Sequence, residues 1–382
     1  MKYVRYFDDA SEIGSGIDVD LPSVVYLNGK NVLYAENGKD KKALIQVNDQ
    51  GEVYETYYST MPLTFEAIES GTFKFTYATQ YSTDNGTTWV NLTPNTNTPT
   101  IAAGNKIMWK ATLIPSSSTG IGTFSATGNF NAYGNVMSLL YSDNFIGQTD
   151  LTDKSYAFYR LFYNNTKIVS TKNIILPATT LTSNCYNSMF RGCTSLTTAP
   201  ELPATTLASS CYGSMFNGCT SLTTAPELPA TTLADYCYEY MFYGCTSLTT
   251  APALSATSLA EGCYASMFQS CTSLTTAPAL PATTLANYCY HFMFGSCTSL
   301  TTAPELPATT LAESCYEYMF QGCTNLNYIK AMFTTEPSTT YTNNWVSGIS
   351  STGTFVKNSV ATWNVTGVNG IPIGWTVQTA SS

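Results

Sequence analysis

The sequence predicts a mainly β protein with short helices, in which a repeat solenoid follows a β-rich N-terminal half. Two observations carry this prediction. All twelve cysteines lie on two ladders in the C-terminal half, and neighbouring members of each ladder are 26 residues apart. Before residue 150, short runs that alternate apolar and polar residues are separated by turn residues, as in β-strands. We therefore divide the chain into residues 1–58, 59–150, 151–330 and 331–382.

Residues 1–58 are expected to form β-hairpins. Two apolar runs, 24–27 and 32–34, flank Asn28-Gly29, which is a strong cue for a hairpin turn. A second hairpin is expected to turn at Gly51. So short a segment cannot bury its own apolar side. We therefore interpret it as a region for anchoring or oligomerisation.

Residues 59–150 are expected to form a β-sandwich-like domain. Runs such as 73–77 and 107–111 alternate in polarity and are separated by turns at the spacing typical of sandwiches.

One turn motif in this region, S-x-D-x-G-x-x-W, begins at Ser82 and ends at Trp89. It resembles the Asp box of sialidase propellers. We expect Asp84 to cap the turn, Gly86 to adopt φ > 0, and Trp89 to pack beneath. A single copy makes no propeller, and the chain has no arginine cluster suited to a sialate carboxylate. The motif therefore indicates a stabilised hairpin and not a glycosidase.

Six near-identical units dominate residues 151–330. Each unit reads L-P-A-T-T-L-A-x-x-C-Y-x-x-M-F-x-G-C-T-S-L-T-T-A-P-E. Its period lies inside the range of about 20–29 residues that is typical of leucine-rich repeats. One such unit cannot bury its own apolar face, so the units are expected to stack into a solenoid.

The third copy illustrates the elements expected in each unit. Residues 222–225 and 231–233 suit extended pieces, and residues 234–243 suit a short helix that ends at Gly244. The side chains expected in the core of this copy are Leu222, Leu228, Leu233, Cys237, Met241 and Phe242.

Both ends of the array are expected to be atypical, as terminal repeats usually are. Residues 156–169 resemble a decayed unit, in which Ala157 and Asn165 replace the two cysteines. The repeat pattern is lost at 327–330, and residues 331–382 are interpreted as a β-rich capping module.

The F-x-G-C-T-S-L-T core of each unit resembles the BspA-like leucine-rich repeats of gut bacteria, their phages and some protozoa. The resemblance covers about residues 155–330, although the family's unit is usually a few residues shorter. It implies cell-surface adhesion or ligand binding, and it implies no catalytic residues.

The cysteines leave three interpretations open. A disulfide within each unit is conceivable, because Cys237 and Cys245 are close in sequence. A metal site would need closer ligand spacing, such as C-x₂-C. The favoured interpretation is a ladder of reduced, buried thiols, since the chain begins without a recognisable signal peptide and cytoplasmic thiols stay reduced.

The core positions hardly change among the copies, and the variable positions are the two residues before the first cysteine, the second and third residues after it, and the residue after Met-Phe. Surface drift is one explanation of this variation. The other is a ligand-contacting strip, because exposed aromatic residues provide contact area at low entropic cost. The candidate ligand-binding residues are Tyr236, Tyr240, Tyr243, Tyr288, His291, Phe292 and Tyr318.

Composition argues against several function classes. The net charge is −9, with 16 Lys and Arg against 25 Asp and Glu, which disfavours nucleic acid and anionic membranes. Between residues 177 and 329 the only Lys or Arg is Arg191. One histidine in the chain makes histidine-based catalysis or a histidine-rich metal site improbable. We therefore expect no enzyme, no cofactor, no metal and no membrane insertion.

The sequence favours a structural or adhesive virion protein, such as a head or tail fibre of a phage of gut Bacteroidota. The N-terminal region would contact other virion proteins, and the solenoid would contact a host-surface protein or carbohydrate. The alternative is a bacterial cell-surface adhesin of the BspA type. A homo-oligomer is expected in either case, with a trimer favoured.

Overall fold

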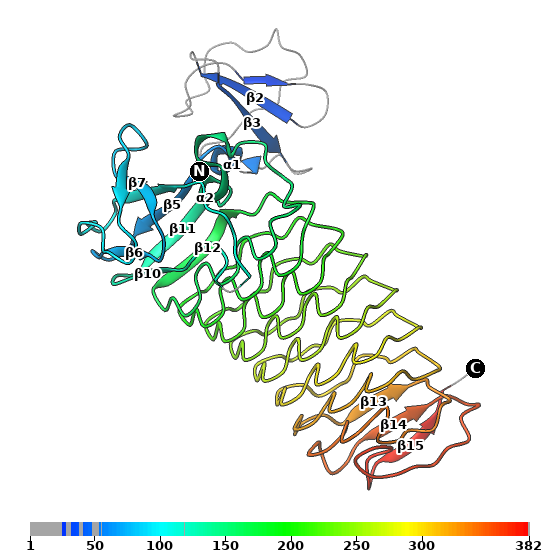
Figure 1. Ribbon diagram of the computed structural model, residues 1–382. Coiled ribbons are helices and arrows are strands. Elements are labelled where there is room, and N and C mark those ends of the chain that lie inside the picture. Colours follow the sequence, from blue (N-terminus) through cyan, green and yellow to red (C-terminus); the bar gives the residue numbers. More distant parts are fainter. Residues whose placement is uncertain are drawn as a thin grey trace.

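The computed structural model describes strands at residues 25–27, 32–37, 41–47 and 53–54, and then residues 56–117 and 119–380. The protein is mainly β, with short helices and several open sheets (Figure 1). The helices are α1 (Thr56–Ser59), α2 (Ser138–Tyr141) and the 3-10 turn η2 (Ser142–Asn144).

The first sheet is an antiparallel meander. Its strands, in order, are β1 (Val25–Leu27), β2 (Val32–Asn37), β3 (Lys41–Val47) and β4 (Val53–Tyr54). Both predicted hairpin pairings are therefore present. The predicted turn residues, Asn28-Gly29 and Gly51, lie outside the described residues.

A six-stranded mixed sheet follows, and it joins the N-terminal half to the repeats. Its order is β12 (Ile168–Ile175), β11 (Phe130–Asn135), β5 (Leu63–Ala67), β9 (Lys106–Lys110), β7 (Thr79–Ser82) and β8 (Val90–Leu92). A two-stranded sheet pairs β6 (Phe73–Phe75) with β10 (Phe124–Ala126). Since β12 pairs with β11 and Ser170 bridges to Thr198, the sheet continues past residue 150 into the repeats.

The turn motif between β7 and β8 has the expected construction. Asp84 accepts hydrogen bonds from Ser82 Oγ at 2.7 Å and from the amide of Thr88 at 2.9 Å. These hydrogen bonds, with that of the Thr88 hydroxyl foremost, lower the pKa of Asp84 to about 2. Gly86 has φ 83° and lies against Trp89.

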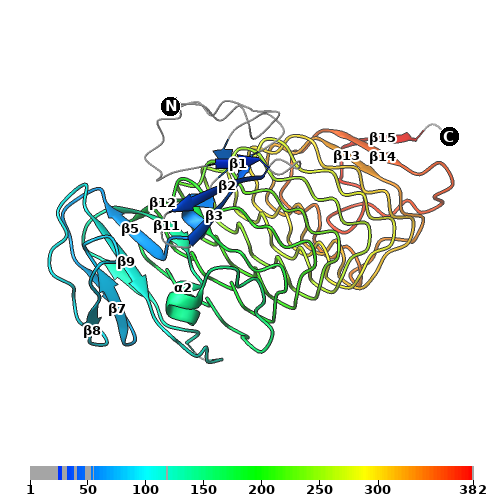
Figure 2. The ribbon, with the colours of Figure 1, turned by 90° about the horizontal axis from the view of Figure 1, so that it is seen from above.

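The repeats form successive coils that lie side by side between the N-terminal sheets and the C-terminal strands (Figures 1 and 2). We call this arrangement the coil stack and number the coils by their cysteines. The pairs of coils 1 to 6 are Cys185/Cys193, Cys211/Cys219, Cys237/Cys245, Cys263/Cys271, Cys289/Cys297 and Cys315/Cys323. The preceding cap coil carries Ala157 and Asn165 in their place. Parallel bridges such as Thr198–Thr224 and Thr224–Thr250 tie one coil to the next.

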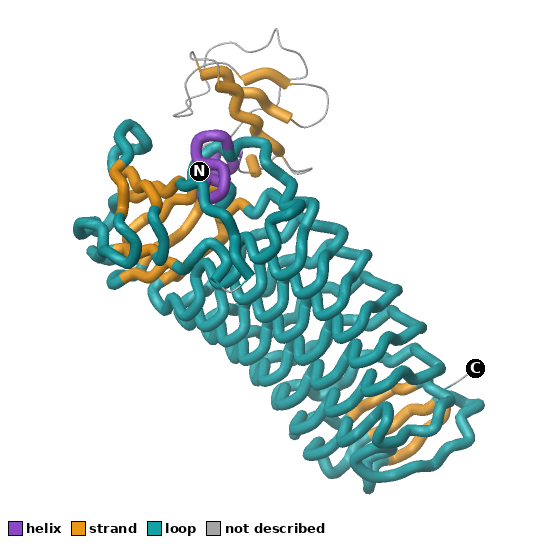
Figure 3. The backbone as a smooth tube through the Cα atoms, viewed as in Figure 1, coloured by secondary structure: helices purple, strands orange, loops and turns teal. Residues whose placement is uncertain are grey.

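The helix predicted at residues 234–243 is wrong. The segment is a run of turns, drawn as loop in Figure 3. Alternate amides bond the carbonyl three residues earlier, as Met241 does to Tyr238 at 3.1 Å. The amides between them bond the next coil, as Phe242 does to Met267 at 2.9 Å. A helix would use these amides internally and leave none for the neighbouring coil.

Every fourth residue of this segment has a left-handed backbone. In coil 3 the φ angles are 57° at Tyr236, 55° at Tyr240 and 68° at Gly244. A turn of type II needs such an angle at its third residue. Aromatic residues rarely adopt it, because the Cβ atom approaches the following carbonyl.

The backbone at Tyr240 makes a prediction that separates the two local structures. In a helix, glycine would destabilise this position by about 1 kcal/mol relative to alanine. At φ 55° the order reverses, so Tyr240→Gly is expected to be more stable than Tyr240→Ala by about 1 kcal/mol. Urea unfolding of the two variants measures the difference. If Tyr240→Ala is the more stable variant, the predicted helix is supported instead.

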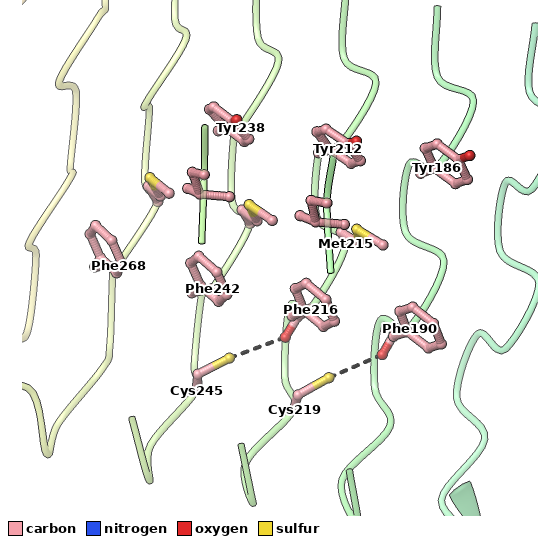
Figure 4. Packing of buried hydrophobic residues seen from close by; sticks show 14 of the residues in the cluster. Tyr186, Phe190, Tyr212, Met215, Phe216, Cys219, Tyr238, Phe242, Cys245 and Phe268 are labelled. Carbon is pink, nitrogen blue, oxygen red and sulfur yellow. Dashed lines mark hydrogen bonds between the residues drawn. The ribbon is translucent and has the colours of Figure 1, made fainter. Parts of the chain in front are cut away.

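Two aromatic ladders run through the interior of the stack (Figure 4). The tyrosines that follow the first cysteine stack from Tyr186 to Tyr316, with ring centroids 5.6 to 6.0 Å apart. The phenylalanines of the Met-Phe pairs stack from Phe162 to Phe320 at 5.4 to 5.8 Å. Both ladders are almost completely buried. The tyrosine ladder was missing from the predicted core, because the phenol group suggests exposure.

All twelve cysteines are free and buried, as the favoured interpretation expected. The second cysteine of each coil also has a partner that the sequence did not reveal. Its thiol donates to the Phe carbonyl of the preceding coil, for example from Cys245 to Phe216 at 3.1 Å (Figure 4). In the cap coil, Asn165 donates in the same way to the carbonyl of Phe124 at 3.1 Å. The first cysteine has a weaker contact, since Cys237 Sγ lies 4.0 Å from its acceptor.

This difference predicts that replacing the two cysteines of a coil with serine has unequal effects on stability. Cys245→Ser keeps a donor beside the Phe216 carbonyl, so we expect stability to change by less than about 1 kcal/mol. Cys237→Ser buries a hydroxyl with a poorly placed acceptor and is expected to cost about 1–3 kcal/mol. Urea unfolding of the two variants compares them under identical conditions. Equal losses would show that the thiol hydrogen bonds contribute nothing.

The sequence suggested that the repeat pattern ends at residues 327–330, but the coils continue past this point. The amides of Tyr318 and Phe320 bond the carbonyls of Asn343 and Trp345 at 2.9 Å, which defines a seventh coil. Asn344 has φ 50°, like Tyr318 one coil earlier. The pattern was invisible in the sequence, because Trp345 and Val346 replace the Met-Phe pair and no cysteine remains. A parallel sheet joins β13 (Tyr328–Ala331), which precedes this coil, to β14 (Thr354–Lys357) and β15 (Thr376–Thr379), which follow it.

Candidate functional site

The described residues offer little that resembles an active site. A pocket of about 140 Å³ lies beside the six-stranded sheet, lined by residues that include Glu66, Lys106 and Asn131. It is small, since sites for organic ligands usually measure about 300–1,000 Å³. Among these residues no group of three or more His, Cys, Asp or Glu side chains is placed to hold a metal ion. No helix of the described chain has the length and apolar character to span a bilayer.

The seven candidate residues from the sequence lie on one side of the coils. We call this side the variable face, defined by the positions that differ among the copies. Only Tyr240 is exposed, with 37% of its surface accessible, and the others are half-buried. Five of the seven have left-handed φ angles of 52–57°: Tyr236, Tyr240, Tyr288, Phe292 and Tyr318. Their positions are therefore fixed by a rigid backbone.

The structure brings four of these residues together on coils 5 and 6. Phe292 stacks on Tyr318 with ring centroids 4.3 Å apart. His291 lies edge-on to Phe292 at 4.9 Å and to Tyr288 at 5.9 Å. Its Nε2 atom is 3.7 Å from the carboxylate of Glu317. Burial lowers the pKa of His291, and the carboxylate of Glu317 opposes this.

The three tyrosines of coil 3 form a separate group. Tyr240 and Tyr243 meet edge to face at 5.9 Å. Tyr236 leans over coil 4, where its hydroxyl donates to Glu261 and its ring covers Gly262. The hydrogen bond to Glu261, with some burial, raises the pKa of Tyr236 to about 12. Small residues of coil 4 separate this group from coils 5 and 6.

The cap coil adds a third aromatic group that the sequence reasoning missed. The guanidinium of Arg160 lies 4.8 Å from the ring centroids of both Tyr159 and Tyr163. Arg191 of coil 1 approaches Tyr163 at 6.0 Å. The predicted alignment of Ala157 with the first cysteine already placed these residues at variable positions. They were overlooked because only the six complete copies were compared.

Comparison with protein-family models, with curated proteins and with solved structures found no match to this chain. The site is therefore described by its own geometry alone. It is a rigid face with aromatic groups at fixed places, a cationic end and an acidic end.

Proposed function

We propose that the protein is a structural and adhesive virion appendage, built as a BspA-like leucine-rich-repeat solenoid. In this proposal a β-sandwich and a β-rich module cover its two ends. The N-terminal region contacts other virion proteins, and the solenoid contacts a host-surface protein or carbohydrate. Binding, and not catalysis, is its role.

One observation carries the proposal. The coils repeat almost unchanged in their interior, yet the variable face holds aromatic residues at backbone positions that suit glycine or asparagine. A left-handed backbone costs about 1–2 kcal/mol for a residue with a Cβ atom. Tyr240, Phe292 and Tyr318 incur this cost, and so do the serines that coils 1, 2 and 4 place there, so the backbone is the same whichever side chain it carries. Aromatic side chains at positions that serine fills equally well in other coils are expected at a contact surface.

The thiols support cytoplasmic assembly, which is how virion proteins are made. Twelve reduced cysteines are stable in a reducing compartment, whereas exported proteins tend to form disulfides. Alkylation of denatured protein from its natural source, without reductant, is expected to modify all twelve thiols. Six disulfides would favour the exported adhesin instead.

Attachment and particle labelling test the function itself. Antibody against the coil stack is expected to label virions in electron micrographs, and purified protein is expected to bind host cells and block infection. A variant that lacks coils 2 and 3 keeps the repeat register. Its binding to host cells is compared with that of the full chain and is expected to be weaker. Unlabelled particles together with no binding to host cells would refute the proposal.

A further inference from the structure

The variable face alternates between large and small side chains in an ordered way. The third position after the first cysteine shows the order most clearly. From the cap coil to coil 7 this row reads Arg160, Ser188, Ser214, Tyr240, Ser266, Phe292, Tyr318 and Asn344. The sizes are therefore large, small, small, large, then small, large, large, small. Each size in coils 4 to 7 is the opposite of the size at the same place in the series from the cap coil to coil 3. When the whole row is read backwards, every large position becomes small and every small position becomes large.

We propose that the variable face pairs with the variable face of a second copy of this chain, with the two stacks antiparallel. A two-fold axis that lies in the interface between coils 3 and 4 produces this arrangement. In this row every large side chain then faces a small one, whereas at the position after Met-Phe Tyr243 faces Gln269 and Arg191 faces Gln321. Tyr240 lies opposite Ser266 of the other copy, Phe292 opposite Ser214, Tyr318 opposite Ser188, and Arg160 opposite Asn344. Ser188 and Ser266 are almost completely buried, so the large side chains of the partner would lie over them.

A second row supports the same pairing independently. The second position after the first cysteine reads Tyr159, Asn187, Gly213, Glu239, Ala265, His291, Glu317 and Asn343. Its sizes follow the same order as the first row. His291 would face Gly213 of the other copy, and Glu239 would face Ala265. Two rows that share one axis of complementarity fit a C2 interface, in which one surface patch contacts itself.

Charge selects the antiparallel arrangement over the parallel one. The cations of the variable face, Arg160 and Arg191, lie on the cap coil and coil 1, and neither forms an ion pair within the described chain. The Nε atom of Arg160 is buried without a hydrogen-bond partner there. Antiparallel pairing places coil 1 against coil 6, where Glu313 and Glu317 lie. Parallel pairing would place aromatic on aromatic and every acid on its counterpart in the other copy, which is repulsive, whereas antiparallel pairing opposes only Asp235 to Glu261.

The length of the face suits a stable dimer. Eight coils spaced by about 4.8 Å span about 34 Å. A standard interface buries about 800 Å² on each partner, which corresponds to a patch about 28 Å across.

This inference rests on the proposed function in one respect, because it takes the variable face as a contact surface. It names a second copy as the occupant of that face. The exposed threonine segments of each coil, such as Thr223-Thr224 and Thr249-Thr250, stay free for a host surface.

Size complementarity is tested with two steric variants of the full chain. The wild type is expected to be a dimer by light scattering after gel filtration. Ser266→Tyr creates two tyrosine–tyrosine clashes in the homodimer and is expected to be monomeric. Tyrosine fits this backbone position in coils 3 and 6, so the variant should fold, which circular dichroism verifies. Mixed with Tyr240→Ser, it is expected to form a heterodimer, visible by native mass spectrometry, because serine then faces each tyrosine.

Charge complementarity is tested with a charge swap. Arg191→Glu is expected to raise the dimer dissociation constant about tenfold, and Glu317→Arg in the same chain is expected to restore most of this loss. Glu201→Arg, at an exposed position outside the variable face, is the control and should change little.

The outcomes separate this inference from the proposed function. A monomeric wild type would overturn the pairing. So would a dimer that Ser266→Tyr leaves intact, or a mixture that forms no heterodimer. A monomer that binds host cells, and loses that binding when Tyr240, Phe292 and Tyr318 are all replaced by serine, would assign the face to the host ligand. The proposed function would then stand without the pairing.

Discussion

Raising the pH above 9 is expected to unfold the coil stack cooperatively. Burial raises the pKa of Cys185 and Cys237 to about 12, from the ordinary value of 9.0. The pKa values of the other ten cysteines are raised for the same reason. The folded state therefore keeps its thiol protons where the unfolded state loses them.

The sign of this effect follows from proton linkage. Well below pH 9 both states hold the thiol protons, so the thiols leave the stability unchanged. Above pH 9 only the unfolded chain releases them, and stability falls until the pH reaches the raised pKa values. At pH 10 each thiol contributes a loss of about 1.4 kcal/mol. Twelve thiols then remove about 17 kcal/mol, which exceeds the usual stability of about 5–15 kcal/mol.

Two signals measured together test this expectation. Circular dichroism reports the loss of structure, and the rate at which an alkylating reagent modifies the cysteines reports thiolate formation. Both are expected to change in a single step between pH 9 and 10, and both should recover on return to pH 7 under reductant. Thiolates that appear gradually near pH 9, without loss of structure, would show that solvent reaches the cysteines.

Replacing Phe242 with alanine is expected to destabilise the protein by about 3–5 kcal/mol. Phe242 is fully buried and stacks on Phe216 and on Phe268, each with ring centroids 5.7 Å apart. The substitution opens a cavity in coil 3 and interrupts the ladder, so it weakens two coil interfaces at once. The melting temperature measures the effect.

Tyr240→Ala is the matched control for this prediction. Tyr240 lies two residues earlier in the same coil, and 37% of its surface is exposed. Its replacement by alanine removes a ring of similar size. We expect a loss of less than about 1 kcal/mol from this variant. Equal losses in the two variants would contradict the assignment of Phe242 to the interior.

The repeat itself could be predicted because its signal is local and multiplied six times. Cysteine, methionine and phenylalanine at constant spacing identify the side chains of the interior, and Cys237, Met241 and Phe242 are all fully buried. The cap coil was also recognised, since Leu161-Phe162 keeps the apolar pair. The paired strands of residues 25–54 followed from alternation and turn residues in the same way.

Other features depend on residues that are far apart in the sequence. Coil 7 kept the backbone pattern while losing the cysteines and the Met-Phe pair, so the sequence showed no repeat there. The thiol hydrogen bond of Cys245 joins it to Phe216, 29 residues earlier. Neither partner carries a local sign of the other. The grouping of Tyr288, His291, Phe292 and Tyr318 likewise required the stacking of coils 5 and 6.

By itself the sequence determined the repeat length, most residues of the core and the positions that vary. Only the tertiary structure decided the local conformation of those residues. Spacing at 237, 241 and 242 fits one side of a helix, and it equally fits the turns that the chain adopts. The turns form because half of their amides find carbonyls in the next coil, about 25 residues away, as from Phe242 to Met267. A single coil lacks those partners, so the stack of coils, and not local propensity, selects the backbone.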